Sequence, residues 1–244
     1  LPPALPLWLV GIGSAFGVFV GKELFGGTGR NLFNPALVGR CFLALSYPAA
    51  FAGTWVKPGT GLWGRLFTYV GPSTADALTT ATPLVLAKNG VISPLADLYI
   101  GRVAGCVGET SVVAILLGGL FLIAVGVANW RTVIAALGSF GILAAVLGML
   151  YPDQFAGAPA IWHLGAGGLM FGAFFMTTDP VTAPVTDGGK WCYGVLIGVL
   201  TVLIRNLTGY VEGVMFAILL GNICAPIMDE VVVRIRLRRL RDER

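Results

Sequence analysis

Charged residues are scarce in this sequence. Only 11% of its 244 residues are Asp, Glu, Lys or Arg, whereas soluble domains contain about 25%. Hydrophobic residues make up 56% of the chain, and the mean hydropathy is +0.84. So few charges cannot cover the surface of an ordinary soluble protein. The sequence therefore predicts an integral membrane protein.

Histidine and cysteine are also rare, which excludes several kinds of site. His163 is the single histidine, and one histidine without partners makes neither a metal site nor a catalytic triad. It follows Trp162, and we expect it to be an interfacial anchor. The cysteines show no CxxC spacing, so we expect small buried side chains rather than disulfides or metal ligands. They are Cys41, Cys106, Cys192 and Cys224.

Glycine and C-terminal arginine, in contrast, are abundant. The 35 glycines indicate close helix packing, because small residues let transmembrane helices approach one another. Most of the net charge of +4 comes from residues 230–244, a basic tail directly after an apolar segment. Such tails face the cytoplasm, and without an accompanying soluble domain this one does not indicate a nucleic-acid partner.

Seven apolar windows approach the length that crosses a bilayer, about 17–25 residues. They are 5–20, 36–53, 111–128, 132–150, 161–177, 191–206 and 213–229. We therefore expect residues 1–244 to form a single transmembrane domain. The chain starts without methionine, and its first window lacks the charged start and cleavage site of a signal peptide. We accordingly expect a fragment that lacks N-terminal helices.

Placing the basic tail 230–244 in the cytoplasm assigns a side to every loop. The short loops that carry Lys22, Arg30 and Arg131 then also lie inside, as the positive-inside rule requires. The connection 54–110 becomes a long periplasmic loop. Its own cations weigh little, because the rule applies to short loops.

A glycine-rich turn lies at one of the inner boundaries. In FGGTGRNLFNPALVGR, the glycines Gly26, Gly27 and Gly29 allow positive φ angles or a ligand close to the backbone. The alternative is a tight turn before a helix that is capped by Asn34 and has Pro35 at its first position. The stretch is not a P-loop, because no GK[ST] follows.

Three acids stand beside apolar windows, where a charge is costly and indicates ion or proton passage. Asp179 precedes a proline and alternatively forms a turn. We expect Asp229 to end the last helix, where its charge opposes the helix dipole and invites a cation, either Arg234 or a passing Na⁺. Glu109 is expected to be a favourable acid in the first turn of the next helix.

The stretch DALTTATPL gathers hydroxyl groups behind an aspartate. Thr82 precedes a proline and should be extended, while Asp76, Thr79 and Thr80 can satisfy turn amides. Local propensity alone therefore predicts a solvated loop. Threonine is a poor nucleophile without a base, so special chemistry at Thr82 would require modification by another protein.

A set of motifs runs in order along the chain. They are KELFGGTGRNLFNPALVGRCFLALSYP, DALTTATPL, GCVGETS, NWR, WHL, FFMTTDPVTAP, KWCYGVLIGVLTVLIRN and EGVMFAILLGNICAPIMDEVV. The set resembles the B subunit of the Na⁺-translocating NADH:quinone oxidoreductases. The D subunit of the Rnf ferredoxin:NAD⁺ complexes is a close competitor. ATPL leans towards the Rnf protein, whereas GGTGRNLFNPALVGR and the basic tail lean towards the sodium-translocating enzyme.

The resemblance implies a covalent flavin. The family's flavinylation motif is Asp-x-x-[Ser/Thr]-[Gly/Ser/Thr]-Ala-Thr, and here it comprises Asp76, Thr79, Thr80, Ala81 and Thr82. By this resemblance, a separate flavin transferase joins FMN through its phosphate to the Thr82 oxygen. The flavin would then supply the redox chemistry that the protein side chains lack.

The resemblance also implies further cofactors and partners. A non-covalent riboflavin is expected nearer the cytoplasm, and we look for it beside Gly26, Gly27 and Gly29. Asp179 and Asp229 match acidic positions implicated in Na⁺ movement. Ubiquinone is the implied electron acceptor, and the other subunits of a membrane redox complex are the implied partners.

The implied fold is an all-α, polytopic membrane helix bundle of ten helices, of which about seven are visible here. The bundle consists of two inverted five-helix repeats resembling urea transporters and lies in the bacterial inner membrane. The implied function is electron transfer towards ubiquinone coupled to Na⁺ export. The Rnf subunit is the first alternative. A flavin-free channel on the same scaffold is the second, because fold does not determine function.

Overall fold

The computed structural model describes residues 1–52, 57–58, 69–70, 82–88, 90–151, 158–208, 210 and 212–242. Its elements are α1 (Leu7–Gly21), η1 (Glu23–Phe25), α2 (Pro35–Ser46), α3 (Pro48–Ala52), β1 (Lys57–Pro58), β2 (Tyr69–Val70), α5 (Pro83–Lys88), α6 (Leu95–Ile100), α7 (Val112–Ala124), α8 (Trp130–Leu150), α9 (Ala160–Gly165), α10 (Leu169–Phe171), η2 (Gly172–Met176), α11 (Asp187–Leu207) and α12 (Val214–Asp242). The strands β1 and β2 form one short antiparallel ladder. Helices make up the rest of the regular structure in these residues, which confirms the predicted helix bundle.

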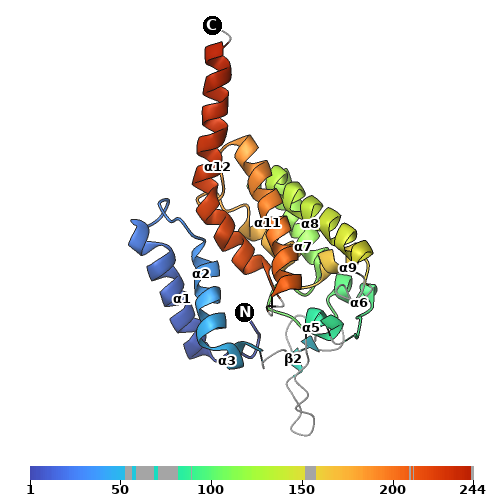
Figure 1. Cartoon of the computed structure of the whole chain (residues 1–244). Coiled ribbons are helices and arrows are strands. Elements are labelled where there is room, and N and C mark those ends of the chain that lie inside the picture. The colour runs from blue at the N-terminus through green and yellow to red at the C-terminus, as the bar shows by residue number, and fades with distance from the viewer. Residues whose placement is uncertain are drawn as a thin grey trace.

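The long helices run back and forth through the bundle in chain order (Figure 1). The helices α1, α8, α11 and α12 are long and apolar enough to cross a membrane, and α2 and α7 are shorter apolar helices. The consecutive elements α9, α10 and η2 occupy the remaining predicted window, 161–177. Each predicted window thus coincides with helical structure, and the chain is a multi-pass membrane protein.

The connections gather at two ends of the bundle (Figure 1). The short helices α3, α5, α6 and α9 lie at one end, whereas the C-terminal part of α12 projects from the opposite end. The described part of the connection 54–110 includes α5 and α6, so it lies on the opposite side from the basic tail. The alternation predicted this relative arrangement.

Side-chain caps begin several of these helices. Asn34 Oδ1 accepts hydrogen bonds from the amides of Ala36 at 3.0 Å and Leu37 at 3.4 Å, and Pro35 occupies the first position of α2. The predicted cap is therefore confirmed, and it satisfies amides that have no partner inside the helix. The same role is filled at α7, α8 and α11 by Ser111, Asn129 and Thr186.

Glycines bring pairs of spans into backbone contact. A Cβ on Gly17 of α1 would lie 2.4 Å from the Pro35 carbonyl oxygen, and a Cβ on Gly39 of α2 would lie 2.4 Å from a carbonyl oxygen of α1. Between α8 and α11, a Cβ on Gly198 would lie 2.4 Å from the Ala136 carbonyl oxygen. No larger residue fits at these contacts, which confirms that glycine serves helix packing here.

The main buried cluster lies among α8, α11 and α12, with one side of α2 packed against it. Tyr193 and Asn222 lie inside it and hydrogen-bond to each other at 2.7 Å, so this polar pair is satisfied in the core. Many large apolar side chains, including Leu117, Ile142 and Leu207, are exposed. Exposed apolar side chains of this kind are typical of the helices of a membrane protein.

Two predictions about the spans are wrong. The last helix does not end at Asp229 but continues to Asp242, so the basic tail is helical as far as that residue. The window 161–177 is not one helix, because α9 ends at Gly165 and Gly167 has a φ of 68°. A residue in the left-handed region cannot continue a right-handed helix, so this span is broken.

Candidate functional site

Thr82 lies directly before the first residue of α5. Its carbonyl oxygen accepts a hydrogen bond from the Leu86 amide at 3.0 Å, and the residue is only 5% exposed. Local propensity predicted a solvated loop, and for Thr82 itself this is wrong, because the residue is buried immediately before α5. The other motif residues, Asp76, Thr79, Thr80 and Ala81, lie outside the described residues.

A small cavity of about 10 Å³ lies beside Thr82. Its lining includes Glu109 and Glu212 together with Gly165 and Gly167 of the broken span. Two carboxyl-bearing side chains and two glycines therefore border the same space as the threonine. The space holds at most about one water molecule, so a flavin ring cannot occupy it.

Arg40 of α2 connects carboxylates from two other parts of the fold. Its Nη2 donates to Glu212 Oε2, and its Nη1 lies 3.8 Å from Glu109 Oε2. The side chain is 13% exposed in Arg40, 5% in Glu109 and 21% in Glu212. We call Arg40, Glu109 and Glu212 the ion cluster. It ties the α1–α2 hairpin to the segments that precede α7 and α12.

Cys106 supports the ion cluster from the same loop as Glu109. Its amide donates to Glu109 Oε1 at 2.9 Å, and its sulfur accepts a hydrogen bond from Arg40 Nη2 at 3.4 Å. Burial raises the pKa of the Cys106 thiol, and the charge on Glu109 adds to the shift. The thiol therefore stays protonated and acts as a packing and hydrogen-bonding group rather than as a thiolate nucleophile.

Glu212 is the member of the ion cluster that titrates near neutral pH. Burial and, secondly, the adjacent charge on Glu109 raise its pKa from the ordinary value of 4.5 to about 7, although Arg40 opposes the shift. Two neighbouring carboxylates cannot both ionise cheaply. One guanidinium facing two carboxyl groups therefore leaves the protonation of Glu212 sensitive to its surroundings.

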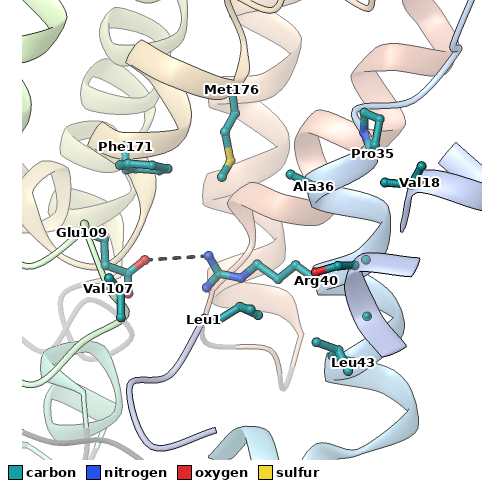
Figure 2. Close-up of a pocket in the computed structure, with 13 residues that line it drawn as sticks. Leu1, Val18, Pro35, Ala36, Arg40, Leu43, Val107, Glu109, Phe171 and Met176 are labelled. Carbon is teal, nitrogen blue, oxygen red and sulfur yellow. Dashed lines mark ion pairs between the residues drawn. The ribbon is translucent and has the colours of Figure 1, made fainter. Parts of the chain in front are cut away.

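A larger cavity of about 440 Å³ also borders the ion cluster. Figure 2 shows the Arg40 side chain reaching from α2 towards Glu109, with Phe171 and Met176 on the side of the broken span. The rest of the lining is mostly apolar and includes Leu43. Glu109 thus borders both this cavity and the small one beside Thr82.

Arg205 lies at the break in the span that α9 and α10 form. The residue is 6% exposed, and its guanidinium donates to the carbonyl oxygens of His163 at 2.9 Å and Ala166 at 3.0 Å. Its Cζ lies 5.0 Å from the centre of the Phe140 ring. One side chain of α11 thus holds the broken span and contacts α8.

Asp179 forms a turn on the opposite end of the bundle. Its Oδ1 accepts from the Val181 amide at 3.1 Å, and its Oδ2 accepts from the Thr182 hydroxyl at 3.0 Å, as in an Asx turn. Asp179 and Lys190 also border a cavity of about 390 Å³. The aspartate therefore stabilises the turn and lines a cavity different from the two that border the ion cluster.

Asp229, which lies in α12, binds the loop that follows Asp179. Its carboxylate accepts from the amides of Val185 at 2.8 Å and Thr186 at 2.9 Å, and also from the Thr186 hydroxyl. Arg234 was one of the cations expected beside Asp229, and this alternative is wrong. Because the helix continues, Arg234 pairs instead with Glu230, one turn earlier, at 2.7 Å, as residues four apart on a helix do.

A family model for the NQR2, RnfD, RnfE family matches residues 1–238. The chain belongs to this family. Relatives named as the B subunit of the Na(+)-translocating NADH-quinone reductase are 44% identical in Azotobacter vinelandii and in Ectopseudomonas mendocina, and 42% identical in Pseudoalteromonas atlantica. Each comparison covers 98% of this chain and 58% of the relative, so the chain spans little more than half the length of these proteins.

The glycine-rich turn of this NQR2, RnfD, RnfE family member joins α1 to α2. Gly26, Gly27 and Gly29 have φ angles of 104°, 88° and 88°, which L-residues with a Cβ rarely adopt. The turn alternative therefore accounts for all three glycines. Their proximity to a riboflavin stays a prediction.

Several charged residues of this family member were missed or misread in the sequence. Arg40 and Arg205 lie inside predicted apolar windows, and Glu212 lies at the edge of one, which is the signal that could have singled them out. Glu109 was predicted to be a first-turn acid, and this is wrong. It precedes the Ser111 cap of α7, and its carboxylate faces Arg40 instead.

The cysteines are free thiols with unequal exposure. Cys106 is buried, Cys41 and Cys224 are half-buried, and Cys192 is exposed, so the prediction of burial is wrong for Cys192. Cys192 lies on the exposed side of α11 rather than in the core. His163 packs its ring edge against Trp162, with 5.1 Å between the ring centres, and its role as an interfacial anchor stays a prediction.

Proposed function

We propose that the chain is the membrane subunit of a Na⁺-translocating NADH:quinone reductase, which carries FMN and passes electrons towards ubiquinone while Na⁺ leaves the cell. The observation that carries the proposal is 44% identity, over 98% of the chain, to relatives named as the B subunit of that enzyme. The motif from Asp76 to Thr82 is complete in the sequence, which supports the flavin.

Thr82 would hold the FMN through a phosphoester bond to its hydroxyl oxygen, and the bound flavin would supply one-electron and two-electron redox chemistry. The hydroxyl has the right chemistry for this bond. The small cavity beside it is too small for the ring, so the flavin would extend away from that cavity. Because Thr82 is buried, a flavin transferase would have to meet this segment in a more open arrangement.

Covalent flavin is tested by the mass and fluorescence of the purified chain. We expect the mass of one esterified FMN after co-expression with a flavin transferase, and a fluorescent band on a denaturing gel. Thr82→Ala should abolish the band. Thr110→Ala is the matched control, because Thr110 lines the same cavity but lies outside the motif. Fluorescence that persists in Thr82→Ala would contradict the attachment site.

The proposed orientation places Thr82 on the periplasmic side and the C-terminus in the cytoplasm. The supporting observations are the basic residues of α12 and the position of α5 at the opposite end of the bundle. The riboflavin is proposed on the cytoplasmic side, near the turn with Gly26. A membrane-impermeant thiol reagent should label a cysteine placed after Asp242 only in opened cells, and labelling in intact cells would contradict the orientation.

Asp179 and Asp229 are proposed to act in Na⁺ passage. Asp179 borders a cavity, and Asp229 holds the loop that follows Asp179. We expect Asp179→Asn to weaken the stimulation of quinone reductase activity by Na⁺ in the assembled complex. Asp187→Asn is the control, since Asp187 is an exposed acid on the same face that pairs with Arg131. Equal Na⁺ dependence in both variants would mean that Asp179 stabilises its turn but takes no part in Na⁺ passage.

The Rnf subunit remains the alternative within the family, because the matching family model includes RnfD. The proteins that co-purify decide between the two, and an NADH-oxidising flavoprotein is expected for the sodium pump. A flavin-free channel is the alternative outside redox chemistry. It requires that the chain carry no flavin in the mass experiment.

A further inference from the structure

The break between α9 and α10 leaves backbone carbonyl groups without their helical donors. In a continuous helix, the carbonyl oxygens of His163 and Ala166 would accept from amides four residues ahead. The helix stops at Gly165, and Gly167 turns with a φ of 68°. Inside a membrane, each carbonyl that lost its partner would be costly.

Arg205 replaces both of these missing donors. Its Nη1 donates to His163 at 2.9 Å and its Nη2 donates to Ala166 at 3.0 Å. A guanidinium presents its N–H groups in a planar fork, so two nitrogens of one side chain can each serve one carbonyl group. Glu212 and Glu109 act on its buried charge from nearby, which lessens the cost of burying it.

The same break is the surface on which the Thr82 segment rests. A Cβ on Gly167 would lie 2.6 Å from Leu84 Cδ1 and 3.5 Å from Arg205 Nη2. Leu84 is in the first turn of α5, two residues after Thr82, and Gly165 and Gly167 border the cavity beside Thr82. The chain of contacts from Arg205 to the break, from the break to Leu84 and from Leu84 to Thr82 is thus continuous.

We propose that Arg205 is a positioning residue for the flavin-bearing segment: by holding the break between α9 and α10, it fixes the surface that seats α5 and Thr82. Only the part of this inference that concerns the flavin rests on the proposed function. The seating of α5 is a property of the protein alone. Loss of the guanidinium frees two carbonyl groups, the break relaxes, and Leu84 loses the surface formed by Gly167.

Hydrogen exchange measured by mass spectrometry tests the seating without any flavin. In Arg205→Met, we expect the peptide containing residues 82–88 to exchange about tenfold faster or more, because hydrogen bonds from a buried charged donor are lost. Gly167→Ala keeps Arg205 but places a methyl group against Leu84, and should accelerate the same peptide. Arg131→Met is the matched control, because Arg131 pairs with an exposed carboxylate at the other end of the bundle.

Time-resolved fluorescence anisotropy of the covalent flavin is the second readout, in the assembled complex. We expect faster depolarisation in Arg205→Met and Gly167→Ala than in wild type and Arg131→Met, counted only over the flavin-loaded fraction. A merely structural role would reduce the amount of protein but leave the flavin in the remaining molecules equally restrained.

The two readouts separate the possible failures. Unchanged exchange at residues 82–88 in both Arg205→Met and Gly167→Ala would overturn the inference, whatever the flavin does. Faster exchange in variants of a chain whose wild type carries no flavin would uphold the seating and contradict the proposed function. Faster exchange with unchanged anisotropy would show that the segment is seated by Arg205 but that the flavin is held elsewhere, which overturns the positioning role.

Discussion

Removing Arg40 should destabilise the protein in a way that depends on pH. Arg40→Met keeps an unbranched side chain in α2 but removes the guanidinium that faces Glu109 and Glu212. The two carboxyl groups then remain close together without the counter-charge from the α1–α2 hairpin. The hairpin also loses its ionic connection to the segments before α7 and α12.

The burial of the pair sets the size of the effect. With Arg40 13% exposed and Glu109 5% exposed, removal of one partner leaves an uncompensated buried charge, which costs about 3–5 kcal/mol. Protonation recovers part of this cost, because a neutral carboxyl group no longer needs the counter-charge. We therefore expect the full loss well above the Glu212 pKa of about 7 and a smaller loss below it.

The assay is unfolding of the purified chain in mixed micelles with increasing SDS, at one pH above and one below the Glu212 pKa. Arg234→Met is the matched control, because Arg234 forms an exposed ion pair with Glu230, at 71% and 59% exposure, and such pairs contribute about 0–1 kcal/mol. Equal losses for the two arginine variants would refute the reasoning about burial. A loss for Arg40→Met that does not change with pH would refute the role of the carboxyl pair.

Three further outcomes are expected. The pKa of Glu212 is raised from its ordinary value of 4.5 to about 7 in the folded protein, chiefly by burial. The free energy of unfolding of the wild type should therefore fall as pH rises from about 4.5 to about 7. Glu212→Gln should remove that fall in SDS unfolding curves. Gly17→Ala should cost about 1–3 kcal/mol in the same assay by overpacking against α2, whereas Gly11→Ala meets nothing within 4 Å and should not destabilise; equal effects would contradict the contact. Asp229→Asn should accelerate hydrogen exchange in residues 177–186, because the loop loses carboxylate acceptors, and unchanged exchange would show that the loop holds itself.

The spans and the Asn34 cap of α2 could be predicted because their signals are local. Hydropathy located the described helices that are long and apolar enough to cross a membrane, and the Asn34-Pro35 pair located the start of α2 to the residue. The relative sides of the loops followed from the alternation of spans. These features depend on a few consecutive residues and on the bilayer, both of which are known before any tertiary contact is considered.

The break and the ion cluster could not be predicted in the same way. The window 161–177 is almost uniformly apolar, and the carbonyl groups freed by its interruption at Gly167 accept hydrogen bonds from Arg205, which lies on a different helix. Glu109 similarly takes its role from Arg40, which lies far earlier in the chain. Such roles arise from packing between distant segments, which one sequence does not reveal.

One continuous helix, α12, joins the basic residues near the C-terminus to the bundle. At 29 residues, the helix is about 44 Å long, whereas the hydrocarbon layer is about 30 Å thick. Its last turns project beyond the rest of the bundle (Figure 1), and Pro226, inside the helix, lacks the N–H that would bond to the preceding turn. A bend of α12 at Pro226 would therefore move the arginines that follow it together, relative to the helices packed against the first half of α12.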